Sequence, residues 1–320
     1  MSKPRPPVAD SSAAMDIVQA FKDRAKGDPA MTGAALEDVL RLVPGKRAIL
    51  SGRYAGRRAV FRFHIDEPQK NATRNWAELT RAFAYMCDGD LRVNAPLDHA
   101  PELGLVVVEH VQGMPLMQRL WRAPHAARAE YLAPAAGWLR KYTAPTEERI
   151  PARLEGWLSR ARKAAASQPY EHLRPVEAAL LAEMERIAPA LAGRPWRVAI
   201  CHGDFHPNNL LVEGTRLTGI DTGGSAKLPV YKDMARFLAH MGRRGLIPSG
   251  QRRFGVDRAG LDAFAGAFAL DEMETALALP FMIGVEALIR VESKALSRSR
   301  IRRSEAFYEE LLGDMRELDS

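Results

Sequence analysis

The chain has 320 residues, enough for one large domain or two lobes with a substantial core. Hydrophobic residues make up 47% of it, which excludes a disordered protein, and its two cysteines, Cys87 and Cys201, are too few for a disulfide framework. The 46 basic and 39 acidic residues give a formal charge of +7, but both signs are scattered along the chain, as on an ordinary solvated surface.

Neither a signal peptide nor a membrane span is expected from the hydropathy pattern. The N-terminal residues lack an apolar segment, and the longest apolar stretch, ALALPFMIGVEALI, is broken by Pro280 and carries Glu286. We therefore expect a soluble, cytoplasmic protein that does not bind a membrane. The oligomeric state is not encoded in any pattern we can identify.

The first third of the chain predicts a small lobe with strands and helices. Residues 1–13, rich in Pro, Ser and Ala, are expected to be a disordered tail, and a helical pattern follows at residues 15–24. The runs RAILSGRY and RRAVFRFHID have strand composition and are joined by Ala-Gly, which predicts a hairpin. A helix is expected over NWAELTRAFAYM and a further strand over LGLVVVEHV. The apolar face of that helix is predicted to consist of Trp76, Leu79, Phe83 and Met86.

The remaining two thirds predict a larger, mostly helical lobe. Pro175 opens a helical pattern, and KDMARFLAHM predicts a second helix. Short strands are expected at RVAI, NLLV and RLTGID, and the chain to residue 320 reads as helical apart from a loop near residues 248–250. With the lobe boundary after Gly113, the organisation is a tail (1–13), an N-terminal lobe (14–113) and a C-terminal lobe (114–320).

The stretch CHGDFHPNNLLV concentrates small polar groups immediately before a strand, as a loop that holds charges in fixed positions would. Asp204 lies in this loop, Asn209 precedes the strand, and RLTGI runs back to Asp221. A turn about Thr215 would place Asn209 almost opposite Asp221, with Cβ atoms roughly 5 Å apart. Two oxygen ligands at that separation could share Mg²⁺, leaving Asp204 to orient a hydroxyl and accept its proton.

The spacing H-x-D-x-x-x-x-N followed by a separate Asp matches the kinase catalytic loop and metal-binding Asp. HGDFHPNN, GIDTGG and KDMARFL together resemble the aminoglycoside phosphotransferase and choline kinase family, from about RAILSGRY through the C-terminal helices. The resemblance implies a two-lobed, protein-kinase-like α+β fold with a small β-rich N-lobe and a larger, mostly helical C-lobe. It further implies ATP as donor, Asp204 as catalytic base, and Asn209 and Asp221 as Mg²⁺ ligands. Asp233 resembles the family's Asp that buttresses the catalytic loop, although it could be an ordinary first-turn acid.

The same resemblance assigns nucleotide-binding residues in the first lobe. VVVEHVQGMPL corresponds to the hinge that reads adenine through main-chain groups, around Glu109 to Val111. AVFR places Arg62 where the family carries a phosphate-contacting Lys, with Glu78 of the following helix as its expected partner. A planar guanidinium fork is not equivalent to an ammonium group, and LSGRYAG is a weak glycine-rich loop, so the donor could also be GTP.

Two functions remain open at this point. The first is a small-molecule kinase that phosphorylates a hydroxyl of a sugar, an amino alcohol or an aminoglycoside-like compound. The alternative is a kinase-fold nucleotide-binding regulatory protein with weak or no catalysis. Only eleven residues separate Asp221 from Asp233, which argues against a protein kinase, and no motif indicates nucleic-acid binding.

The acceptor is not identified by any motif. A cationic acceptor would require an acidic or aromatic pocket, which the late acids Glu305, Glu309, Glu310 and Asp314 could supply, although they read as a solvated helix face. The basic balance of the chain favours a sugar or an anionic acceptor, and the run Arg298, Arg300, Arg302 and Arg303 reads as a solvated face or an anion-binding one.

Overall fold

The computed structural model describes residues 16, 18–23, 26–27, 31 and 33–318. The predicted disordered tail, residues 1–13, lies outside the described residues. Contacts between Cα atoms divide the chain into two compact units. The first comprises the chain up to Gln112 together with Ile220–Gly223, and the second comprises Gly113–Gly219 and Gly224–Ser320.

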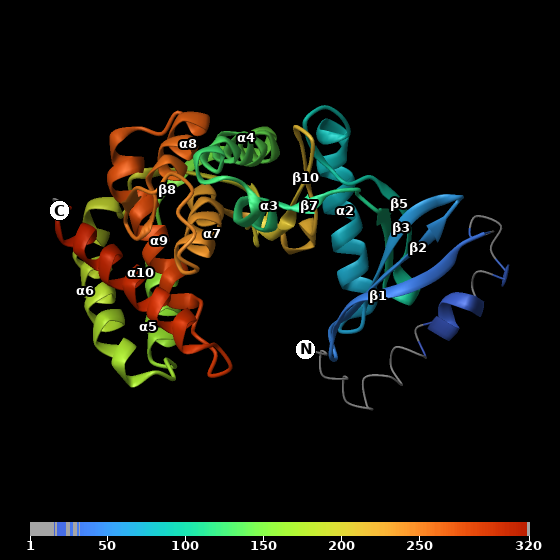
Figure 1. Ribbon diagram of the computed structural model, residues 1–320, viewed down its shortest axis with the longest axis horizontal. Coiled ribbons are helices and arrows are strands. Elements are labelled where there is room, and N and C mark those ends of the chain that lie inside the picture. Colours follow the sequence, from blue (N-terminus) through green and yellow to red (C-terminus); the bar gives the residue numbers. More distant parts are fainter. Residues whose placement is uncertain (1–15, 17, 24–25, 28–30, 32, 319–320) are drawn as a thin grey trace. The chain divides into compact units, whose positions relative to one another are not determined.

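A five-stranded sheet forms the first unit, with strand order β1-β2-β3-β6-β5 (Figure 1). Its strands are β1 (Ala35–Val43), β2 (Arg47–Tyr54), β3 (Arg57–His64), β5 (Pro96–Ala100) and β6 (Leu105–Glu109). All of these pairings are antiparallel. The predicted β2–β3 hairpin is confirmed, because Tyr54 pairs with Arg57 across a two-residue turn in which Ala55 and Gly56 both have positive φ.

Alternation along β3 separates a core face from a polar face. Ala59, Phe61 and Phe63 are buried and pack with Phe21, which belongs to the helical residues 18–23. Arg62, one position out of phase, projects from the other face of the sheet. Packing requires glycine at position 52 of β2, because a Cβ there would lie 2.0 Å from the main-chain oxygen of Ala35 on β1.

The helix α2 (Pro68–Met86) lies along this sheet and starts seven residues before the predicted segment (Figure 1). Its buried face is rotated relative to the prediction: Leu79 and Met86 are buried as expected, whereas Trp76 and Phe83 are only partly covered. Ala72, Asn75 and Ala82 are the other buried residues of this helix. The short strand β4 (Leu91–Val93) follows.

Three small sheets contribute strands to the second unit. β7 (Met114–Pro115), β10 (Leu210–Glu213) and β11 (Arg216–Gly219) are consecutive antiparallel neighbours in the order β7-β10-β11. β8 (Glu148–Pro151), β9 (Pro195–Cys201) and β12 (Ala226–Pro229) form a three-stranded sheet with β9 in the middle. β13 (Arg252–Arg253) and β14 (Val256–Asp257) form a hairpin.

Helices make up most of the second unit, as predicted. They are α3 (Leu116–Arg122), α4 (Leu132–Thr143), α5 (Glu155–Ala165), α6 (Arg174–Leu191), α7 (Val230–Gly242), α8 (Arg258–Phe268), α9 (Leu279–Ile289) and α10 (Arg298–Arg316). The apolar helix α9 is buried along almost its whole length and packs against α5, α6 and α7 (Figure 1). The four predicted inward residues of α7, Met234, Phe237, Leu238 and Met241, are fully buried. None of the helices in the described part of the chain has the length and apolar character needed to cross a membrane.

Candidate active site

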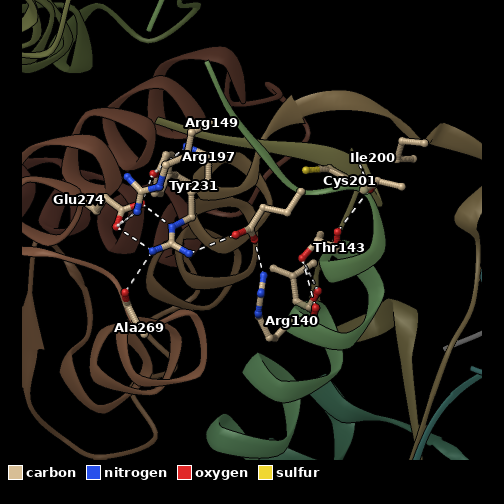
Figure 2. A network of polar contacts seen from close by, with 12 residues as sticks. Arg140, Thr143, Arg149, Arg197, Ile200, Cys201, Tyr231, Ala269 and Glu274 are labelled. Atoms are coloured by element: carbon tan, nitrogen blue, oxygen red, sulfur yellow. Dashed lines mark hydrogen bonds and ion pairs between the residues drawn. The ribbon is translucent and has the colours of Figure 1, made fainter. Parts of the chain in front are cut away.

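The strand that leads into the loop His202-Gly203-Asp204 is anchored by a buried ion-pair network (Figure 2). Arg197 of β9 donates to Glu274 at 2.6 Å and to Glu147 at 3.1 Å, and the hydroxyl of Tyr231 donates to Glu274 at 2.6 Å. Burial alone would raise the pKa of Glu274, but the hydrogen bonds from Arg197 and Tyr231 lower it to about 2. The network therefore ties β9 to α7 and to the turn before α9.

The backbone of the loop is held by α7. Gly203 has φ 85°, and a Cβ at this position would lie 2.3 Å from the main-chain oxygen of Gly224, so only glycine fits here. Asp233 is fully buried and its two carboxylate oxygens accept the Gly203 N–H at 3.1 and 3.2 Å, while Lys232 donates to the Gly203 carbonyl at 3.0 Å. Asp233 thus contacts the loop directly, which favours the buttressing role over that of an ordinary first-turn acid.

Aromatic packing supports the loop from below. His202 is fully buried among the rings of Trp138, Tyr142 and Phe205 and is part of this packing. Cys201 is buried as well, and burial raises the pKa of its thiol far above the ordinary value. The side chains on either side of Gly203 are therefore fixed by packing, and the adjacent carboxylate is held on a rigid support.

Two guanidinium groups and an imidazole surround the carboxylate of Asp204. Nε of Arg236 donates to its Oδ1 at 2.9 Å, Nη2 of Arg290 lies 3.6 Å from the same oxygen, and Nε2 of His206 lies 3.4 Å from Oδ2. Burial by itself would raise the pKa of Asp204, but His206 and Arg236 lower it well below its usual range. The carboxylate is ionised at neutral pH and partly exposed, so it can accept a hydrogen bond from a substrate hydroxyl.

Asn209 is oriented by the same loop. Its Nδ2 donates to the main-chain oxygen of Asp204 at 3.0 Å, which directs the amide nitrogen to the protein and leaves the amide oxygen for another ligand. The β10–β11 hairpin pairs Leu210 with Gly219 and turns at Gly214-Thr215, so its register is offset by one residue from the predicted one. The offset arises because the two strands join through a two-residue turn rather than a turn centred on a single residue.

Asp221 belongs to the first unit, where two arginines surround its carboxylate. Nη2 of Arg62 donates to Oδ1 at 2.6 Å, and Nη1 of Arg47 lies 3.6 Å from the same oxygen. Asp221 adopts φ 66°, in the left-handed region that few residues other than glycine occupy. Burial, followed by the charges of Arg62 and Arg47, lowers the pKa of His64 to about 4. The two guanidinium groups are donors of the kind that phosphate oxygens accept.

The expected ion pair between Arg62 and Glu78 is wrong. Arg62 pairs with Asp221, and Glu78 accepts two hydrogen bonds, at 2.9 and 2.7 Å, from Arg81 one turn later on α2. The i, i+3 spacing on one helix brings Glu78 and Arg81 together locally. The ion pair expected from the family's Lys is therefore not formed by the Arg62 guanidinium.

The hinge segment offers main-chain groups rather than side chains. The Glu109 carboxylate is occupied by two hydrogen bonds from Arg92, at 2.7 and 2.8 Å, and one from the Ala95 N–H at 3.0 Å. The His110 N–H donates to Arg58 of β3, but the Val111 N–H has no acceptor among the described residues. A donor left open beside a strand end is the group that a purine base requires.

The residues that could hold nucleotide and metal have suitable chemistry. An amide oxygen of Asn209 and a carboxylate of Asp221 are the hard oxygen ligands that Mg²⁺ takes. The guanidinium groups of Arg62 and Arg47 have the charge that phosphate groups require, and the Val111 N–H is a donor of the kind that a base accepts. The contacts of Arg236 and Arg290 with Asp204 were not predicted from the sequence. Arg236 follows Asp233 by three residues on α7, a helical spacing that could have indicated it, whereas no nearby pattern indicates Arg290.

Solved structures of similar architecture cover nearly the whole chain. A choline kinase LicA from Streptococcus pneumoniae matches with a TM-score of 0.56 and 13% identity, covering 92% of this chain and 99% of its own. The aminoglycoside phosphotransferase APH(4)-Ia matches at 0.57 and 14% identity, covering 96% and 100%. A choline/ethanolamine kinase family protein from Mesorhizobium loti matches at 0.58 and 14%, covering 94% and 99%. The fold is therefore the predicted kinase-like one.

Sequence comparison provides the family. No curated protein matches the chain significantly. The family model described as the phosphotransferase enzyme family matches residues 49–266, which is more than half of the chain and includes the loop around Asp204 and the hairpin that follows it. The chain therefore belongs to the phosphotransferase enzyme family.

Proposed function

We propose that this protein is an ATP-dependent kinase that transfers the γ-phosphoryl group to a hydroxyl of a small molecule. The observation that carries the proposal is the ionised carboxylate of Asp204, held by Arg236 on a loop whose backbone is bonded to the buried Asp233. Phosphoryl transfer needs little covalent chemistry from the protein but requires positioning and neutralisation of charge. A rigid carboxylate beside guanidinium groups meets both requirements.

In the proposed reaction, Asp204 orients the acceptor hydroxyl and takes its proton. The hydroxyl oxygen forms a bond to the γ-phosphorus while the bond from that phosphorus to the β–γ bridging oxygen breaks, giving ADP and a phosphate monoester. Arg62 contacts the donor phosphates, and the main chain from Glu109 to Val111 reads the base. Mg²⁺, with Asn209 and Asp221 as protein ligands, would neutralise charge on the phosphate oxygens.

Two structural neighbours support the donor assignment. A thermostable mutant of APH(4)-Ia forms a ternary complex with AMP-PNP and hygromycin B, and amicoumacin kinase hAmiN forms a complex with AMP-PNP, Ca²⁺ and Ami. AMP-PNP is an analogue of ATP, so we infer the same donor for this chain. Calorimetric titration with AMP-PNP and with the corresponding GTP analogue distinguishes the two donors.

The test of the proposal is Asp204→Asn. A coupled assay of ADP release, with Mg-ATP and a panel of hydroxylated metabolites, measures turnover, and calorimetry measures AMP-PNP affinity. We expect turnover to fall by about 10² to 10⁴, the usual contribution of a general base, with nucleotide affinity unchanged. Asp262→Asn, an exposed carboxylate on α8, is the matched control.

The alternative, a nucleotide-binding regulatory protein, predicts a different pattern. It requires tight AMP-PNP binding with no ADP release above background from the parent protein under any acceptor. Parent-like turnover in Asp204→Asn would instead show that this protein is an enzyme whose base lies elsewhere.

A further inference from the structure

A cavity of about 270 Å³ lies in the second unit, lined by residues of α7, of the segment that follows α9 and of the start of α10. Its lining is dominated by guanidinium groups. Five arginines line it: Arg236, Arg243, Arg244, Arg290 and Arg300. Two carboxylates also line it, from Glu286 and Glu292, so five positive charges minus two negative charges leave a formal charge of +3.

Both carboxylates are already engaged within the protein. Glu292 is buried, pairs with Arg243, and accepts hydrogen bonds from Gln168 at 2.9 Å and from the Tyr308 hydroxyl at 3.1 Å. Glu286 is also buried and lies 3.5 Å from the Lys232 ammonium and 3.3 Å from Nε of Arg290. Arg243 and Arg290 therefore compensate the two negative charges of the wall. Of the other three lining arginines, Arg236 donates to Asp204, which leaves Arg244 and Arg300.

Neither Arg244 nor Arg300 forms an ion pair within 4.0 Å among the described residues, although the charge of Glu292 acts on Arg300 from farther away. In the same part of the chain, the Arg244 guanidinium donates to the main-chain oxygen of His240 at 2.7 Å. Burial, reinforced by neighbouring arginines, lowers the pKa of Arg244 to about 9 and that of Arg300 to about 10. Half-buried guanidinium groups that repel one another are stabilised by a bound anion, and their planar forks match carboxylate and phosphate oxygens.

The cavity adjoins the proposed base. Arg236 and Arg290 line it, and both also contact Oδ1 of Asp204, at 2.9 and 3.6 Å. A small molecule in the cavity can therefore present a hydroxyl to Asp204 while another part of it contacts the far arginines. A quaternary ammonium or polyamine acceptor would face a net positive wall.

We propose that the acceptor of this phosphotransferase is a small hydroxylated molecule that carries its own oxyanion, a phosphate or a carboxylate, which binds to Arg244 and Arg300. The proposal rests on the function proposed above for Asp204. It departs from choline, the cation in the name of one structural neighbour, because the wall of this cavity carries a positive formal charge.

The first experiment measures ADP release with related acceptors of different charge. Glycerol, glycerol 3-phosphate and glycerate form one set, glucose and glucose 6-phosphate a second, and choline is the cationic comparison. We expect kcat/KM for an anionic acceptor to be at least tenfold higher than for the neutral compound of the same set. Comparison of glycerol 3-phosphate with glycerate shows whether the site prefers a phosphate or a carboxylate. Preferred turnover of a neutral or cationic compound would overturn the acceptor class and leave the kinase assignment standing.

The second experiment measures binding without turnover. Calorimetric titration with inorganic phosphate compares the parent with Arg244→Gln and Arg300→Gln, after thermal melts show that the variants are folded. We expect each variant to lose on the order of ten- to a hundredfold in affinity, the effect of one charge-assisted hydrogen bond. Arg302→Gln, an exposed arginine on the same helix, should bind phosphate like the parent.

The two experiments separate the two hypotheses. Phosphate affinity that is absent in the parent, or equal in the parent and both variants, overturns the anion site. Phosphate binding that depends on Arg244 and Arg300, in a protein that transfers phosphate to no acceptor, supports the anion site and overturns the kinase function.

Discussion

Replacing Glu274 with Gln tests the network that anchors β9. The Glu274 side chain is fully buried and accepts hydrogen bonds from Arg197 at 2.6 Å and from Tyr231 at 2.6 Å. Gln has nearly the same shape, but it is neutral and presents one N–H₂ group to two donors. The substitution therefore removes the charge with little change in packing.

The pKa of Glu274 gives the magnitude. Its ordinary value is 4.5 and the folded protein lowers it to about 2, which corresponds to about 3 kcal/mol of stability at neutral pH. Because the folded-state pKa is the lower one, this contribution is complete above pH 4.5 and is lost as the pH falls through 2. We expect Glu274→Gln to be about 3 kcal/mol less stable than the parent at pH 7, and about 1 kcal/mol less stable at pH 3.

Urea unfolding followed by circular dichroism measures this difference at pH 7, 4 and 3. Glu272→Gln is the matched control, since Glu272 is exposed two residues away in the same turn and should behave like the parent at every pH. Parallel pH profiles for the parent and Glu274→Gln would refute the argument, because the carboxylate would then be as easily protonated in the folded protein as in the unfolded chain.

Three further substitutions test the site itself. Asn209→Ala and Asp221→Ala should each raise the Mg²⁺ concentration required for ADP release, and the double variant should lose less than the product of the two effects; multiplicative losses would mean separate roles. Arg62→Ala should weaken AMP-PNP binding on the order of ten- to a hundredfold by calorimetry, whereas unchanged affinity would make it structural. Asp233→Ala should lower kcat more than tenfold at constant nucleotide affinity, because the Gly203 N–H loses its acceptor. A kcat equal to that of the parent would show that Asp233 does not support the catalytic loop.

Features that depend on neighbouring residues could be predicted from the sequence. The β2–β3 hairpin follows from two strand-like runs joined by Ala-Gly, and the inward face of α7 from the spacing of its apolar residues. The edge strand β1 was missed because most of its side chains are exposed, so it has no alternation of apolar and polar residues. The face of α2 was misjudged because Ala72, Asn75 and Ala82 are buried beside Leu79 and Met86, and the spacing of large apolar residues does not reveal these three positions.

The sequence by itself therefore determined the fold class, the family and the identity of the loop that carries Asp204, since all three depend on local patterns of hydrophobicity and spacing. Only the tertiary structure decided which charges meet. Arg62 pairs with Asp221, 159 positions away, rather than with Glu78, and Arg236 reaches Asp204 from 32 positions away. The arginine-lined cavity likewise collects side chains from separate helices. Ion pairs are fixed by where the packed backbone brings side chains together, and no periodicity along the chain records that.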